Sequence, residues 1–155
     1  MRVAGIWLFL HVLGTVLWLG GVFVLSIWTS RARGTGEMRI VAFAYSTARQ
    51  LYRGLVLTAA TLTIVAGAIL TIVTQRPWFR FFPEHWLFQM QVIGLIAFLI
   101  TLIYIIPKAG ALARLAERGE LESPEFRAGV KGQAIVGSAV GALLIYLVLL
   151  GALRF

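Results

Sequence analysis

The sequence predicts an all-α fold, an integral membrane four-helix bundle. The chain has 155 residues, of which 60% are hydrophobic and only 13% are charged, against about 25% charged residues in an ordinary soluble domain. Four stretches without Asp, Glu, Lys or Arg are long enough, at about 1.5 Å per helical residue, to cross roughly 30 Å of hydrocarbon. They are residues 3–30, 54–75, 86–107 and 132–153. We expect one transmembrane domain over residues 1–155, with spans at about 4–28, 53–75, 86–107 and 132–153.

The basic residues predict the orientation of the bundle. Ten of the fourteen lie in the loops that follow the first and third spans. They are Arg31, Arg33, Arg39, Arg49, Arg53, Lys108, Arg114, Arg118, Arg127 and Lys131. Because basic loops stay in the cytoplasm, we expect a multi-pass protein of a bacterial-type inner (cytoplasmic) membrane, with both termini outside. The expected partner is the lipid bilayer. Nucleic acid is not expected, since no basic patch with interleaved aromatic residues lies outside the spans.

The spans and loops follow one another with recognisable boundaries. The first span has too long an apolar core for a signal peptide, and no cleavage pattern follows it. Residues 31–53 set apolar positions between basic ones at helical spacing, so the second span should begin as a helix on the cytoplasmic side. The next loop carries aromatic residues typical of a membrane interface, namely Trp78, Phe79, Phe81 and Phe82. Ser123 and Pro124 predict a capped start for the last helix, in which Gly137 and Gly141 form a GxxxG packing pattern.

His11 is the polar side chain that stands out in the first span. It belongs to a stripe of residues that recur at steps of four and three, on one face of a helix. The stripe consists of Trp7, His11, Gly14, Trp18, Gly21, Leu25 and Trp28. A polar, metal-ligating ring within hydrocarbon is costly, so His11 is a candidate functional residue. The alternative is a helix-packing seam in which the histidine bonds to a neighbouring helix.

The predicted topology brings polar residues of the third span to the depth of His11. Both spans run inward, and His11 lies about eight residues, or roughly 12 Å, below the outer boundary. Met90 and Gln91 are expected at a similar depth. His85 falls closer to the surface, where it is either an alternative ligand or a side chain exposed to water.

These residues suit haem better than a bare metal ion. The chain has no cysteine, and one or two histidines without an intramembrane carboxylate make a poor cage for an ion. Haem supplies four iron ligands itself and needs one or two axial side chains. We therefore expect haem between the first and third spans, with His11 as a ligand of the iron and Met90 as a possible second axial ligand. Gly14, Trp18 and Gln91 would line the cofactor, and the expected role is electron transfer or haem-based redox sensing.

Four segments of the chain carry a family likeness: Trp7-Leu8-Phe9-Leu10-His11, residues 16–23, Leu51-Tyr52-Arg53 and Trp86-Leu87. These segments resemble the membrane domains of HemJ-type protoporphyrinogen oxidases and of copper-resistance protein D. The resemblance implies a helical bundle whose first-span histidine binds haem b, a role that passes to His11. The chain departs from the family pattern at three places, one of which is Thr58, where the family has a proline early in the second span. Met90 replaces a lysine, and Val130-Lys131-Gly132-Gln133 replaces an Asn-Glu-x-Pro motif.

Two other functions stay open beside haem-based electron transfer. The first is a membrane oxidase of a porphyrin-like substrate, as the resemblance implies. Because proton abstraction needs a positioned base, the loss of the lysine and of the acidic motif argues against it. The second is a cofactor-free accessory or transport subunit of a larger membrane complex or homo-oligomer, in which the glycine-containing faces contact partner helices.

Overall fold

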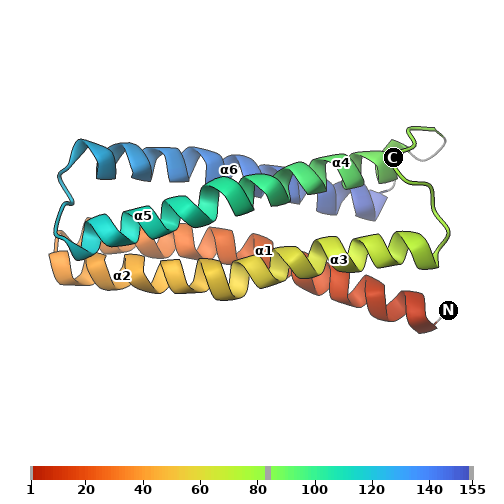
Figure 1. The fold of residues 1–155 in the computed structure, drawn as a ribbon, viewed down its shortest axis with the longest axis horizontal. Helices are drawn as coiled ribbons and strands as arrows, with labels where there is room; N and C mark the ends of the chain where they lie inside the picture. Colours follow the sequence, from red (N-terminus) through yellow and green to blue (C-terminus); the bar gives the residue numbers. More distant parts are fainter. Residues whose placement is uncertain (1, 83–84, 154–155) are drawn as a thin grey trace.

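The computed structural model describes residues 2–82 and 85–153 and folds them into four long helical rods (Figure 1). The first rod is α1 (Arg2–Gly34) and the last is α6 (Pro124–Leu153). The second consists of α2 (Met38–Leu51), the π-helix η1 (Tyr52–Val56) and α3 (Leu57–Val73). The third consists of α4 (His85–Ile100), the π-helix η2 (Thr101–Ile105) and α5 (Ile106–Glu117). All four are long and apolar enough to cross a membrane, which confirms the predicted four-helix membrane bundle.

The rods alternate in direction, so α1 begins and α6 ends at the same end of the bundle (Figure 1). We call this the terminal end. The turns at 35–37 and 118–123, with their flanking arginines, lie together at the opposite end, which we call the basic end. The two loops predicted to be cytoplasmic therefore lie on one side of the bundle.

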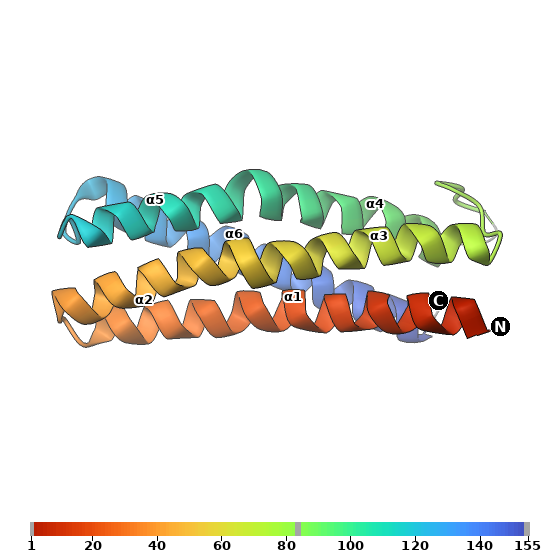
Figure 2. The same cartoon turned by 60° about the horizontal axis from the view of Figure 1, so that its bottom comes forward.

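The helices associate as pairs. In Figure 2, α1 runs beside α2 and α3 along the length of the bundle, and the contacts between α1 and α3 are the most extensive in the structure. α2 packs closely on α5, and α4 packs on α6. By contrast, α3 contacts α4 at few positions. The pairs are thus joined more tightly at the basic end than at the terminal end.

Small residues set the distance between α1 and α3. A Cβ atom on Gly14 would lie 2.6 Å from Thr63 Oγ1 and 2.9 Å from the carbonyl oxygen of Ala59. A Cβ atom on Gly21 would lie 2.9 Å from a methyl carbon of Val56. Hydrocarbon gives no hydrophobic drive for helices to associate, so close backbone approach of this kind supplies the packing energy.

The buried core fills the middle of the bundle and its basic end, and it extends toward the terminal end through Ala66 of α3 and Leu150 of α6. The central cluster includes Trp18, Val22, Val56, Ile105 and Leu144. A second cluster at the basic end consists of Val41, Tyr45, Leu112, Ala113, Ala116 and Phe126. Residues 2–13 and 85–93, which form the terminal ends of α1 and α4, include no buried residue. The terminal end is therefore the less closely packed part of the described chain.

Each of the two middle rods widens into a π-helix near its centre. Pro107 is the second residue after η2 and has no amide hydrogen to continue the α-helical pattern, which accounts for the wider turn before it. Gly54 lies inside η1 and permits a similar distortion. π-helical turns are rare and occur often at functional sites.

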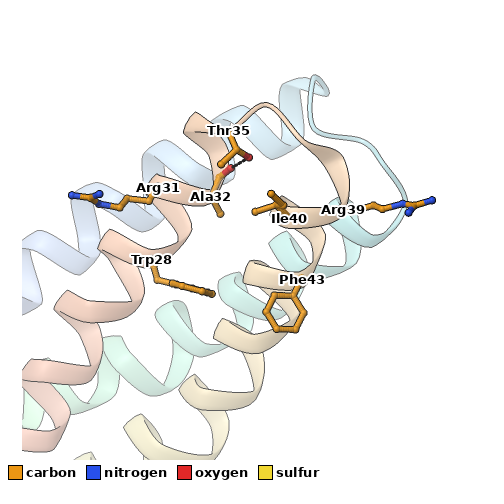
Figure 3. Close-up of a pocket in the computed structure, with 7 residues that line it drawn as sticks. All are labelled: Trp28, Arg31, Ala32, Thr35, Arg39, Ile40 and Phe43. Atoms are coloured by element: carbon orange, nitrogen blue, oxygen red, sulfur yellow. Dashed lines mark hydrogen bonds between the residues drawn. The ribbon is translucent and has the colours of Figure 1, made fainter.

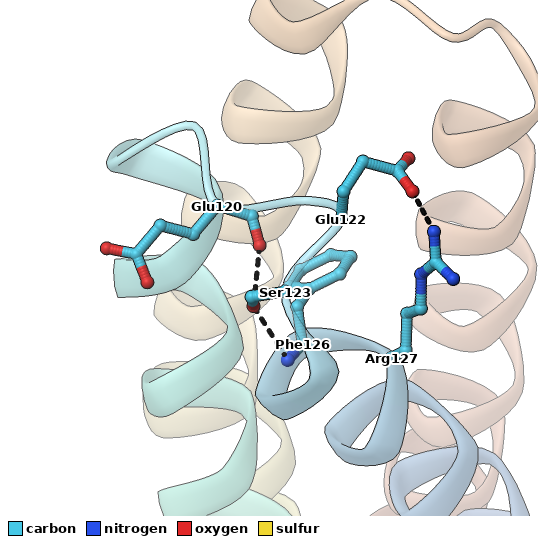
Figure 4. A network of polar contacts seen from close by, with 5 residues as sticks. All are labelled: Glu120, Glu122, Ser123, Phe126 and Arg127. Atoms are coloured by element: carbon cyan, nitrogen blue, oxygen red, sulfur yellow. Dashed lines mark hydrogen bonds and ion pairs between the residues drawn. The ribbon is translucent and has the colours of Figure 1, made fainter.

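The predicted helix boundaries are present in the structure. The second rod begins as α2, which buries Val41, Ala44, Tyr45 and Ala48 on one face, as its amphipathic pattern indicates. α6 begins at Pro124 (Figure 4), where Ser123 Oγ accepts a 3.1 Å hydrogen bond from the Phe126 amide. The Ser123 hydroxyl in turn donates to the carbonyl of Glu120, and Arg127 pairs with Glu122 (Figure 4). The cap is the one expected from Ser123 and Pro124.

Replacing Gly14 by alanine tests the α1–α3 contact. The new methyl group would collide with backbone as well as side-chain atoms, so we expect the free energy of unfolding in mixed micelles to fall by about 1–3 kcal/mol. Gly20→Ala is the matched control, because a Cβ there meets no atom within 4 Å. Equal stability of the two variants would contradict the proposed packing.

Candidate functional site

His11 bonds to the neighbouring helix through one ring nitrogen. Its Nδ1 atom lies 2.8 Å from the backbone carbonyl oxygen of Thr63 in α3. A carbonyl oxygen only accepts hydrogen bonds, so Nδ1 carries the proton and the neutral ring keeps its lone pair on Nε2. Histidines that bind metals usually donate their other ring N–H to a carbonyl or carboxylate in this way, which fixes the tautomer. The His11 ring is thus held in the form that can bind a metal through Nε2.

Gly67 makes room for the His11 ring against α3. A Cβ atom at this glycine would lie 3.0 Å from both Cε1 and Nδ1 of the imidazole. Any larger residue would push the ring away from the Thr63 carbonyl. The Thr63 hydroxyl does not compete with the imidazole for that carbonyl, because it donates to the carbonyl of Ala59, 2.9 Å away.

Trp18 connects the first helix to the third rod. It is fully buried, and its ring meets Phe98 of α4 edge-on, with centroids 6.5 Å apart. α1 and α4 run in the same direction, so His11 and Gln91, each seven residues before this contact, lie at similar depth. The indole Nε1 of Trp18 is buried and has no hydrogen-bond partner among the described residues.

Met90 lies against a different helix from His11. A Cβ atom on Gly151 of α6 would be 3.2 Å from the terminal methyl carbon of Met90 and 3.7 Å from its sulfur. His11 and Met90 therefore belong to different helix pairs, α1 with α3 and α4 with α6. Within the predicted stripe on α1, His11 and Gly14 face the second span, where they contact Thr63 and Gly67, whereas Trp18 contacts the third.

Gln91 and His85 are associated with the loop at the terminal end. Gln91 Oε1 accepts a 2.7 Å hydrogen bond from the Phe79 amide, and its Nε2 donates to the carbonyl of Pro77. Phe79 has a φ of +46°, a strained value for a residue with a side chain, so these bonds help to hold the turn. His85 lies beside Phe81, with ring centroids 6.2 Å apart.

Three residues of this region were not identified from the sequence. Thr63 and Gly67 receive the His11 ring, and Tyr146 of α6 donates a hydrogen bond to Gln89 Oε1. A threonine and a glycine four residues apart on the second span are a weak signal for a close helix contact. The bond from His11 has no sequence signal at its acceptor, because a backbone carbonyl is present at every residue.

The donor set fits haem and does not fit a bare ion. Among the described residues, no three His, Cys, Asp or Glu side chains come together to hold a metal. Haem needs only axial ligands from the protein, and His11 offers one with its tautomer fixed. The residues present are therefore compatible with haem.

The basic end carries an open apolar groove between α1 and α2, with a volume of about 410 Å³. In Figure 3, Trp28 and Phe43 form its sides, while Arg31 and Arg39 point away from it in opposite directions. Such a groove, at the level of the basic loops, suits contact with lipid. The hydroxyl of Thr35, which also lines it, donates to the carbonyl of Ala32.

An all-helical chain with four helices able to span a bilayer is a multi-pass membrane protein. The chain belongs to the family described as predicted integral membrane protein (DUF2269), which it matches over residues 6–155. That description states no activity and names neither of the families that the sequence resembles. No curated protein and no solved structure matches the chain.

Replacing Gln91 by leucine tests its role in holding the aromatic loop. We expect amide hydrogen exchange at Phe79 to become about tenfold faster or more, because the variant removes both side-chain bonds to the loop. Gln89→Leu, the same change two residues earlier in α4, is the matched control, since Gln89 bonds to Tyr146 and not to the loop. Equal exchange in the two variants would show that Gln91 does not hold the loop.

Proposed function

We propose that the protein binds haem b within the bilayer, with Nε2 of His11 as an axial ligand of the iron, and that it serves in electron transfer. The observation that carries this proposal is the hydrogen bond from His11 Nδ1 to the Thr63 carbonyl, which leaves the Nε2 lone pair available. Bound haem b would supply one-electron exchange. The protein's part is to orient the imidazole and to surround the cofactor with apolar helix faces.

The terminal end supports this proposal by its packing. α3 and α4 contact each other at few positions, and no residue of 2–13 or 85–93 is buried. A planar cofactor between the α1–α3 pair and the α4–α6 pair would complete a core there. The residues to hold it are His11 and Gly14 on one side and Met90 on the other, with Trp18 below them. If basic loops are cytoplasmic, this end faces the outer side of an inner membrane.

Met90 is the proposed second axial ligand. It lies at a depth similar to that of His11, and its thioether, which packs against Gly151, is flexible. A methionine ligand raises the reduction potential of a haem. His85 is the alternative ligand, nearer the surface and beside Phe81.

Porphyrin oxidation receives less support than electron transfer. It requires a base that removes a proton from the substrate. At the depth of His11, the third rod offers Gln89, Met90 and Gln91, and none of these is a base. Redox sensing would use the same ligands as electron transfer, and the two differ in the partner that receives the electron.

The absorption spectrum of protein purified under haem-replete conditions tests the proposal. We expect sharp bands of reduced haem b in the wild type, and at least a tenfold lower haem content in His11→Ala. His85→Ala is the matched control and should keep the bands. Colourless wild-type protein would overturn the proposal in favour of a cofactor-free subunit. Bands that survive in His11→Ala but vanish in His85→Ala would move the ligand to His85.

A second variant tests whether the orientation of the ring matters. Gly67→Ala keeps the histidine but places a methyl group against its imidazole, so we expect the haem content to fall. Gly20→Ala is the control, because a Cβ there meets no atom within 4 Å. Normal haem content in Gly67→Ala would show that the bond to Thr63 is not required.

The reduction potential tests the second ligand. If Met90 binds the iron, Met90→Leu should lower the potential, because a thioether ligand favours the reduced state. Leucine has a similar volume, so packing against Gly151 should be largely kept. An unchanged potential and spectrum would show that Met90 only packs against α6.

A further inference from the structure

A small polar cavity lies in the half of the bundle nearer the basic end. Its volume is about 50 Å³. All four rods contribute to its wall, and the polar residues that line it are Ser26, Thr29, Arg33, Tyr45, Tyr52 and Gln133. Trp18, Val22 and Val56, all nearly or fully buried, lie on the side toward the termini and separate the cavity from His11. The cavity is therefore distinct from the candidate haem site.

One acceptor in the wall of this cavity lacks a hydrogen-bond donor. The Oε1 atom of Gln133 is buried and has no partner among the described residues. The hydroxyls of Ser26 and Thr29 already donate to the carbonyls of Val22 and Leu25, at 2.7 and 2.9 Å. These hydroxyls can therefore only accept from a molecule in the cavity. An unpaired acceptor in a membrane interior is costly, so an occupant that donates is favoured.

The two π-helices place their tyrosines beside adjacent residues of α6. Tyr52 is the first residue of η1, and Gln133 lies close to its hydroxyl. Tyr104 of η2 lies against Gly132, where a Cβ atom would be 2.5 Å from the tyrosine oxygen. Two rare helical distortions thus converge on residues 132–133. π-helical turns concentrate at functional sites, which makes this convergence a second indication of a ligand.

We propose that this cavity is a hydration site, occupied by a small cluster of water molecules that reach Tyr52 from the basic end. Water both donates and accepts, as the lining requires: it can donate to Gln133 Oε1 and accept from the tyrosine hydroxyls. A cavity of 50 Å³ holds about one to three waters. An anion fits less well, because Ser26, Thr29 and Gln133 Oε1 present acceptors.

The path to the site comes from the basic end. Ser26 and Arg33 line the cavity and are also exposed, whereas Tyr52 is 4% exposed. Water can therefore pass from the side of the basic loops to the middle of the second rod and stop at the apolar layer of Trp18 and Val56. The proposal does not depend on haem binding.

X-ray footprinting tests this proposal on the whole protein. A pulse of X-rays generates hydroxyl radicals from bound water, and mass spectrometry then measures how fast each side chain is labelled. We expect Tyr52 to be labelled several-fold faster than Trp18, although both are buried, because only Tyr52 lies at the cavity. Gln133→Leu should reduce the labelling of Tyr52 several-fold. Gln50→Leu, the same change at an exposed position of α2, should leave it unchanged.

The Tm of Gln133→Leu is an independent measurement, because it should change in different directions for a hydrated and an empty cavity. If water bonds to Gln133, leucine removes that bond, and the Tm of Gln133→Leu should fall or stay the same. If the cavity is dry, leucine removes an unpaired acceptor, and the Tm should rise. Labelling of Tyr52 no faster than that of Trp18, or a Tm that rises in Gln133→Leu, would overturn the proposal.

Discussion

In a bilayer, each polar group must find its hydrogen-bond partner inside the protein, and this constraint shapes the whole structure. The backbone groups of the four rods bond within their own helices. Threonine and serine hydroxyls donate hydrogen bonds to carbonyls one turn earlier, as those of Thr63 and Thr101 do. His11 is the exception in the first span, because its ring bonds across to another helix. Among the described residues, two buried side-chain atoms lack a hydrogen-bond partner, Nε1 of Trp18 and Oε1 of Gln133, and the second of these indicates where a ligand could bind.

The packing of the bundle changes along its length, and the two proposed sites follow that change. Glycines bring α1 and α3 into close contact near His11, while the two helix pairs approach each other less at the terminal end. The haem site proposed above lies at that end, beside His11. The other half is more tightly joined, through α2 and α5, and encloses only a small polar cavity. The buried layer around Trp18 separates the two environments.

The sequence predicts the fold because hydrophobic length and basic loops are properties of composition. The four spans, the helical start of the second rod and the Ser123 cap are confirmed for this reason. The candidate site was less predictable. Periodicity identifies the face of α1 that carries His11 but not the helix it meets, and that helix is α3. The role of Gln91 depends on the conformation of a turn, and the π-helices depend on tertiary packing, so neither leaves a clear pattern in the residues.

The π-helices also change which side chains can work together on one rod. In an α-helix each residue turns the chain by about 100°, so an additional residue in a turn rotates everything beyond it relative to what came before. η1 and η2 each interrupt their rod near the centre. The side chains of one half of a rod are therefore rotated about the helix axis relative to those of the other half. A single-residue deletion within η1 would realign these halves, turning Thr63 and Gly67 away from α1 while leaving α2 in place against α5.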